Sequence, residues 1–330
     1  MTNHHIIKLL TILNLPQIGM ARAKKILEMA DFSLHENLDF EEKLVETIVR
    51  LKLPIPTKAG LETALDIAFK VVEESGKNNI HLISYRDERY PRNLLSTPDY
   101  PLLLHYKGHL EGLTKNPSLG FIGTRTPTSL GQKYGQRVAK IFTSEGFNII
   151  SGLALGCDTI GHNASVENSS FTVAVLAHGL DMVFPKENTS LSEKILSSGG
   201  LLLSEYSIGV KPRSEYFVAR NRIQAGLSDG LFVLETEVKS GTMHTVNFAT
   251  KYKRPISAFN HPIKYHGQPK AEGNQVLIKN GQATQIYSKD DLLGFCALLK
   301  GLQAPKLNTS IMQEPSNDIN SGSQLKIGFE

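Results

Sequence analysis

The stretch LGFIGTRTPTSLGQKYGQRVAKIFTSEGFNIISG, residues 119–152, decides the fold. It opens with a short apolar run, turns at a segment that carries glycine and arginine, continues through a helix-like segment and closes on a second apolar run. Short apolar runs bounded by turn residues are typical of buried strands, and the segment between them has the length and spacing of a helix. The stretch therefore predicts a β-α-β unit with two parallel strands.

The same rhythm continues after this unit. Further apolar runs occur at FTVAVLA, GLLLSEY, GLFVLET, RPISAFN and TQIYS, and helix-like segments such as LSEKILSSGG separate most of them. Strands that alternate with helices form a mostly parallel sheet that is covered on both faces. The sequence thus predicts an α/β fold with a doubly wound, mostly parallel sheet, in a domain over residues 79–300.

The region before this domain has a different character. Residues 1–78 contain few strand signals, and the apolar residues of IIKLLTILNL and ARAKKILEMA recur at roughly helical spacing, which predicts a small all-α domain. The connecting LPQIG fits a helix-hairpin-helix, whose exposed backbone N–H groups can meet a phosphate, and it also fits a plain helical hairpin. Residues 79–108 predict a brief strand, a helix and a second strand.

Composition narrows the class of protein. The net charge of +4 is far weaker than that of a DNA-packaging protein, so any nucleic-acid site must be local. The two cysteines, Cys157 and Cys296, form neither a zinc motif nor a disulfide framework. The sequence shows no signal peptide and no apolar stretch of membrane-spanning length, so we expect a cytoplasmic protein without membrane contact. Residues 301–330 are polar and rich in Asn and Ser, which predicts a disordered tail.

Turns rich in glycine or lysine follow the predicted strands. In an open α/β sheet, ligands bind at the carboxyl ends of the strands, where helix N-termini offer unpaired N–H groups to an anion. The turn at 123–125 matches neither the dinucleotide fingerprint nor a Walker loop, and taken alone it can equally be structural. The residues at these turns that we expect to contact phosphate are Gly123, Thr124, Arg125, Ser151, Gly152, Gly156, Lys186, Lys239, Ser240, Gly241 and Thr242.

Asp158 and His162 lie four residues apart at a predicted helix start. Such a pair could take part in acid/base or metal chemistry. One carboxylate and one histidine do not make a metal site, however, and Asp158 is favourable at a helix N-terminus. We therefore expect both residues to be structural and predict no metal site.

The segment KPRSEYFVARNR, residues 211–222, mixes basic and aromatic side chains. Basic groups neutralise phosphates, and an aromatic ring offers a stacking face to an unpaired base, worth about 1–3 kcal/mol per base. The segment therefore predicts contact with a single strand, and the alternative is a solvated basic loop over buried aromatic rings. The residues expected to contact nucleic acid here are Lys211, Arg213, Phe217, Arg220, Asn221 and Arg222, with Tyr216 beside them.

Over roughly residues 80–285 the chain resembles the DprA/Smf family of bacterial DNA-processing proteins. The motifs YPRNLL, FIGTR, SGLALGCDTIGH, VAVLAHGLDMVFPKEN, LLLSEY, FVARNRIQAGLSD and ETEVKSGTMHT occur in the family's order and spacing. The resemblance implies an extended Rossmann-like fold that binds single-stranded DNA, forms homodimers and hands the strand to a RecA-type recombinase. It also implies that Arg125 and Lys186 grip phosphate, with Phe217 and Arg220 in the same pocket. We expect no catalytic residue and no cofactor.

Two stretches depart from the family pattern. FNHP at 259–262 stands where the family usually has VPG, and Gly281-Gln282-Ala283 stands where it has Gly-Ala. No C-terminal winged helix is expected. Two other functions stay open: a nucleotide-binding sensor, and a phosphoribohydrolase similar to the LOG type. That enzyme type has a glutamate where Thr245 stands here, so the expected catalytic carboxylate would be missing.

Overall fold

The structure is a computed structural model that describes residues 3–30 and 40–303. Its α-helices are α1 (Asn3–Leu13), α2 (Met20–Met29), α3 (Phe40–Arg50), α4 (Lys58–Lys77), α5 (Arg92–Leu95), α6 (Ser129–Ser144), α7 (Cys157–Glu167), α8 (Thr189–Ser197), α9 (Ser214–Leu227), α10 (Gly241–Lys251), α11 (Pro269–Lys279) and α12 (Lys289–Gln303). Within this described part, no helix is long and apolar enough to cross a membrane. The predicted tail over 301–330 lies outside the described residues from 304 on.

The strands form one mixed sheet. They are β1 (His81–Ser84), β2 (Leu103–Gly108), β3 (Ser118–Ile122), β4 (Asn148–Ser151), β5 (Thr172–Leu176), β6 (Leu201–Ser204), β7 (Gly230–Val233), β8 (Ile256–Phe259) and β9 (Thr284–Ile286). Among the described residues they make a nine-stranded sheet in the order β1-β2-β6-β5-β4-β3-β7-β8-β9. Neighbours from β6 to β9 are parallel, which confirms the predicted α/β fold.

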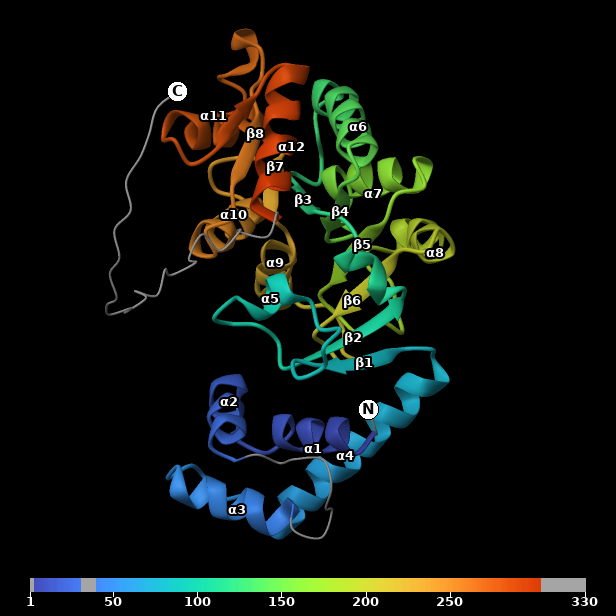
Figure 1. The fold of residues 1–330 in the computed structure, drawn as a ribbon, viewed down its shortest axis with the longest axis vertical. Coiled ribbons are helices and arrows are strands. Elements are labelled where there is room, and N and C mark those ends of the chain that lie inside the picture. Colours follow the sequence, from blue (N-terminus) through green and yellow to red (C-terminus); the bar gives the residue numbers. More distant parts are fainter. Residues whose placement is uncertain (1–2, 31–39, 304–330) are drawn as a thin grey trace, which may run out of the picture.

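The segment 79–108 forms the predicted strand, helix and second strand, as β1, α5 and β2. The sequence did not predict their place in the sheet. β1 pairs antiparallel with β2, and β2 pairs antiparallel with β6, so both strands extend the parallel sheet at one edge. This edge faces the N-terminal helices (Figure 1).

Helices cover both faces of the sheet, because successive side chains of each strand point to opposite sides. Phe121 of β3 packs in one apolar cluster with α6, α7 and α12, whereas the next residue, Ile122, packs in another with α9, α10 and α11. Strands that are buried on both faces need continuous apolar sequences. The apolar runs of the sequence therefore correspond to fully buried strands such as β5, TVAVL.

The strand order reverses between β3 and β7. From β3 the chain builds outward through β4 and β5 to β6, and it then returns to β7 on the other side of β3 to build outward to β9. The connections from the two neighbouring strands leave in opposite directions, which opens a crevice at their carboxyl ends. The fold therefore places a binding crevice where β3 and β7 end.

The N-terminal helices lie beside the β1–β2 edge of the sheet (Figure 1) and share an apolar cluster with β2. Leu9 of α1 and Leu44 of α3 are fully buried in the cluster that also holds Leu103. Lys24 of α2 donates a hydrogen bond to the carbonyl of Pro98 at 3.2 Å. The described part of residues 1–78 is mainly helical, as expected, while the domain boundary at 78 and a phosphate contact by the LPQIG segment, residues 15–19, stay predictions.

The helical region offers a matched pair of substitutions. Ile48 of α3 is fully buried and its neighbour Val49 is 50% exposed. We expect Ile48→Ala to lower the free energy of unfolding by about 2–5 kcal/mol, because it leaves a cavity in the cluster. Val49→Ala should change it by less than about 0.5 kcal/mol. Urea denaturation measures both, and equal effects would contradict the assigned burial.

Candidate functional site

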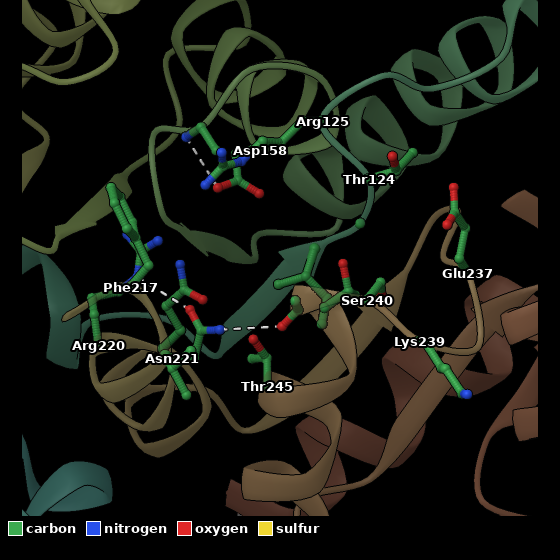
Figure 2. Close-up of a pocket in the computed structure, with 17 residues that line it drawn as sticks. Thr124, Arg125, Asp158, Phe217, Arg220, Asn221, Glu237, Lys239, Ser240 and Thr245 are labelled. Carbon is green, nitrogen blue, oxygen red and sulfur yellow. Dashed lines mark hydrogen bonds between the residues drawn. The ribbon is translucent and has the colours of Figure 1, made fainter. Parts of the chain in front are cut away.

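A cavity of about 420 Å³ occupies the crevice at the ends of β3 and β7. Its wall comes from the loop after β3, the 154–158 turn, one side of α9 and the N-terminus of α10 (Figure 2). The predicted site residues that line it are Gly123, Thr124, Arg125, Phe217, Arg220, Asn221, Lys239, Ser240, Gly241 and Thr242. The tertiary structure thus brings together residues from three separate stretches of sequence.

Arg220 places a buried positive charge in this wall. Its side chain is 5% exposed, and Nη1 donates to the carbonyl oxygens of Gly152, at 2.9 Å, and of Val175. Among the described residues Arg220 has no ion-pair partner. Burial lowers the pKa of Arg220 to about 10, against the opposing charge of Asp158, so the guanidinium stays protonated at neutral pH. Asp158 lies beyond ion-pair distance, so the buried guanidinium still favours an anion in the adjoining cavity.

The ring of Phe217 lies near two guanidinium groups. The Cζ atom of Arg125 is 5.5 Å from the ring centroid, and that of Arg220 is 6.0 Å from it. The ring of Phe184, 42% exposed, lies 5.8 Å from the same ring. A ring in this position is attracted to both cations and still adjoins the cavity. The arrangement combines phosphate-binding groups with a surface on which a base can stack.

The N-terminus of α10 forms the opposite wall. The Ser240 hydroxyl bonds to the Thr236 hydroxyl at 2.7 Å and makes no capping bond to the helix. The first N–H groups of α10 are therefore available to an anion. Asn221 Nδ2 donates to the carbonyl of Gly241 at 3.3 Å and so joins α9 to α10. In Figure 2 the side chain of Lys239 extends away from the other labelled residues.

Glu235, at the end of β7, holds the loop that carries Arg125. Its carboxylate accepts hydrogen bonds from Thr128 N at 2.7 Å, Thr128 Oγ1 at 2.6 Å and His261 Nε2 at 3.2 Å. Its backbone carbonyl accepts the N–H of Thr124 at 2.8 Å. Burial tends to raise the pKa of Glu235, but the hydrogen bonds from His261 and Thr128 outweigh it and hold the pKa below its usual value. His261 belongs to the FNHP segment at 259–262. This segment therefore helps to hold the Arg125 loop, because its histidine bonds to Glu235.

Three predicted site residues shape the cavity without lining it. Ser151 Oγ donates to the carbonyl of Phe121 at 2.7 Å and joins β4 to β3. A Cβ on Gly152 would lie 2.5 Å from Nη1 of Arg220, so only glycine leaves room for that guanidinium. Gly156 has a φ of +79°, and a Cβ there would lie 2.4 Å from the Arg125 carbonyl oxygen. These positions require small residues for close packing beneath the site.

Four further predicted site residues lie outside the cavity wall. Arg222 forms an ion pair with Glu205 at 2.5 Å, with both side chains largely buried. Lys186, Lys211 and Arg213 are exposed. Arg213 lies with its Cζ 5.6 Å from the Tyr216 ring, which in turn stacks on Tyr206. Contact of these four residues with nucleic acid stays a prediction.

Asp158 and His162 have local hydrogen-bond partners, as expected. Asp158 Oδ2 accepts the N–H groups of Gly152 at 3.0 Å and Ala154 at 3.1 Å, and His162 Nδ1 pairs with Thr172 Oγ1 at 2.8 Å. Burial raises the pKa of Asp158, while the charge of Arg220 opposes the rise. Across residues 3–30 and 40–303, His, Cys, Asp and Glu form no group of three or more that could hold a metal.

The sequence missed several residues of the site. Those in the cavity wall are Ile122, Ala154, Asp158, Val218, Gln224, Glu237 and Thr245. Gln224 has a sequence signal, since it follows Phe217 and Asn221 at helical spacing and shares their face of α9. Glu235 has none beyond its place at the end of a strand, because its contacts with Thr128 and His261 join distant segments.

Glu235→Gln tests the support of the Arg125 loop. We expect it to lower the free energy of unfolding by about 1.5–3 kcal/mol at neutral pH, because charge-assisted hydrogen bonds are lost and a buried amide donor faces Thr128. The folded pKa of Glu235 is depressed, so the wild-type advantage should be present above the usual value of 4.5 and disappear as the pH falls through the folded pKa. Chemical denaturation across pH measures this, with exposed Glu237→Gln as the control. A difference independent of pH would contradict the charged role of Glu235.

Comparisons with known proteins agree with this architecture. The family model for DNA recombination-mediator protein A matches residues 81–297. Protein Smf from Synechocystis is 38% identical over 68% of this chain, and the aligned part spans 56% of that relative's length. DNA processing protein DprA from Streptococcus pneumoniae is 39% identical over 64% of this chain and 72% of its own.

Two solved structures share the fold. The S. pneumoniae protein has a TM-score of 0.69 at 31% identity, over 89% of this chain and 98% of its own. DNA processing protein A from Helicobacter pylori, whose structure concerns its single-stranded DNA binding mode, has a TM-score of 0.59 at 27% identity, over 67% of this chain and 96% of its own. With the family motifs in place around the cavity, the chain belongs to the DprA/Smf family of DNA recombination-mediator proteins.

Proposed function

We propose that the cavity binds the sugar-phosphate backbone of single-stranded DNA. The buried, protonated Arg220, which has no ion-pair partner among the described residues, is the observation that carries this proposal. Arg125 adds a second guanidinium, and the N-terminus of α10 adds backbone N–H donors. Phosphate offers the diffuse negative charge that such donors bind, and Arg is suited to it by its planar set of N–H groups.

Single strands fit the site better than duplexes. Phe217 adjoins the cavity beside the two guanidinium groups, so a base stacked there would lie next to its own phosphate. Bases within a duplex are already stacked and paired, and their faces are not free for such contact. The binding of single-stranded DNA by the related H. pylori protein supports this preference.

The wider role follows from the family. We propose that the protein protects single strands and loads a RecA-type recombinase, acting in the cytoplasm as a homodimer and without a catalytic step. The family's description as a recombination mediator supports this role. A phosphoribohydrolase is disfavoured because Thr245, 2% exposed, stands in the wall where the catalytic glutamate of that enzyme type falls, and a hydroxyl is a poor general base.

Binding of labelled oligo-dT, followed by fluorescence anisotropy, tests the proposal. We expect salt-sensitive binding, with log K falling against log salt by about 0.7 for each phosphate neutralised. A duplex of equal length should bind more weakly, and a mononucleotide should not compete at equal phosphate concentration. Absence of oligo-dT binding at low salt would refute the function, and full competition by a mononucleotide would favour a nucleotide sensor.

Two substitutions separate the charged contact from the stacking contact. Arg125→Ala should weaken oligo-dT binding and reduce the salt slope by about 0.7, because one phosphate contact is lost. Phe217→Ala should weaken binding by about 1–3 kcal/mol with an unchanged slope, because stacking releases no counterion. Arg137→Ala on the exposed side of α6 and Phe69→Ala on α4 are the matched controls. Equal slopes for Arg125→Ala and Phe217→Ala would contradict the assigned roles.

A further inference from the structure

The segment 261–270, here called the 261–270 loop, joins β8 to α11, includes the first two residues of α11 and lies beside the cavity. Its sequence HPIKYHGQPK contains two lysines and no acidic residue. It begins at the carboxyl end of β8. The cavity also lies at the carboxyl ends of the parallel strands, so the two are at the same end of the sheet. Lys270 Nζ donates to the carbonyl of Thr126, in the loop that carries Arg125. The 261–270 loop is therefore continuous with the wall of the candidate site.

Hydrogen bonds hold this loop in one conformation. The N–H of Tyr265 donates to the carbonyl of Pro262 at 2.8 Å, and that of Gln268 donates to Tyr265 at 2.9 Å. His266 Nε2 donates to the carbonyl of His261 at 2.6 Å. The loop is anchored at its base, because the His261 side chain bonds to buried Glu235. A backbone held in this way does not have to be ordered on binding, so the cost is limited to the exposed side chains.

The exposed side chains combine apolar and basic character. Ile263 is 86% exposed, the highest value among the large hydrophobic side chains of the described residues. A single exposed apolar residue is common and carries little meaning alone. Here it stands beside Lys264, whose Nζ lies 5.0 Å from the centroid of the half-buried Tyr265 ring. This pairing of a cation with an aromatic ring repeats the arrangement of Arg125 and Phe217 in the cavity.

We propose that the 261–270 loop is a second contact site for the DNA strand, one that binds the nucleotides next to those in the cavity. Ile263 and Tyr265 pack against bases, while Lys264 and Lys270 neutralise phosphates. Lys270 keeps donors for this role, since an ammonium group has three and the structure uses one on Thr126. The inference rests on the proposed function of the cavity and extends it to a longer strand.

Two observations favour DNA over a second copy of this chain as the occupant. The loop is continuous with the candidate phosphate site through the Lys270–Thr126 contact. Its charge also suits a polyanion partner, because residues 261–270 carry two lysines and no acidic residue. Protein–protein contact remains an outcome that the test distinguishes.

The test compares labelled dT oligonucleotides of about 6 and about 20 nucleotides, the shorter confined to the cavity and the longer able to reach the loop. Wild-type full-length protein should gain affinity on the longer strand. The double substitution Ile263→Ser with Tyr265→Ser should lose that gain by about fivefold or more, and Lys264→Ala should flatten the salt slope on the longer strand by about 0.7. The controls are Ile55→Ser in the N-terminal helical region and Lys115→Ala, which precedes the amino end of β3. Thermal unfolding verifies that each variant is folded.

The possible results separate the two proposals. Loop variants that match the wild type on both strands, while Arg125→Ala weakens both, would overturn the loop site and leave the cavity's function intact. A wild type that binds neither strand would refute both. Loop variants with wild-type DNA affinity and a smaller oligomer in sedimentation would show that the loop contacts another copy, which also overturns the inference.

Discussion

The hydrogen bonds of Arg220 to the carbonyl oxygens of Gly152 and Val175 join α9 to the carboxyl ends of β4 and β5. The guanidinium needs these carbonyls because burial removes it from water, and the cavity needs the guanidinium for its positive charge. Glycine at 152 leaves room for it, because a Cβ there would lie 2.5 Å from Nη1 and displace the guanidinium. One contact therefore sets the position of α9, the identity of a glycine and the electrostatics of the site. Phe217 lies one turn earlier on α9, so the hydrogen bonds of Arg220 also fix the position of its ring.

The wall formed by the Arg125 loop depends on a second buried group. Glu235 binds the Arg125 loop through Thr128 and through the N–H of Thr124, and it is itself held by His261. Both walls are thus supported from beneath by charged groups that do not point freely into solvent. A site built this way has its loop backbone and the Arg220 guanidinium in place before a ligand binds, which lowers the ordering cost of binding. The chain's departure from its family at 259–262 is part of this support and begins the loop beside the cavity.

The cavity and the 261–270 loop have the same physical composition, in which a cation lies next to an aromatic ring. Such pairs suit a strand in which phosphates and bases alternate along the chain. The chain belongs to a family of recombination mediators, and the structure of its H. pylori relative concerns the single-stranded DNA binding mode of that protein. The parallel sheet supplies the geometry, because it brings loops from distant parts of the sequence to one edge.

The sequence by itself determined the α/β fold and most of the cavity wall, because apolar runs, turns and basic residues are local patterns. Arg125, Phe217 and the 239–242 turn were all predicted, and the structure brings them together. Only the tertiary structure decided which basic residues carry charge into the cavity. Arg220 and Arg222 are two residues apart, yet the helix turns one toward the cavity and the other toward Glu205. The roles of Glu235 and His261 and the antiparallel edge formed by β1 and β2 likewise depend on contacts between distant segments, which no local pattern encodes.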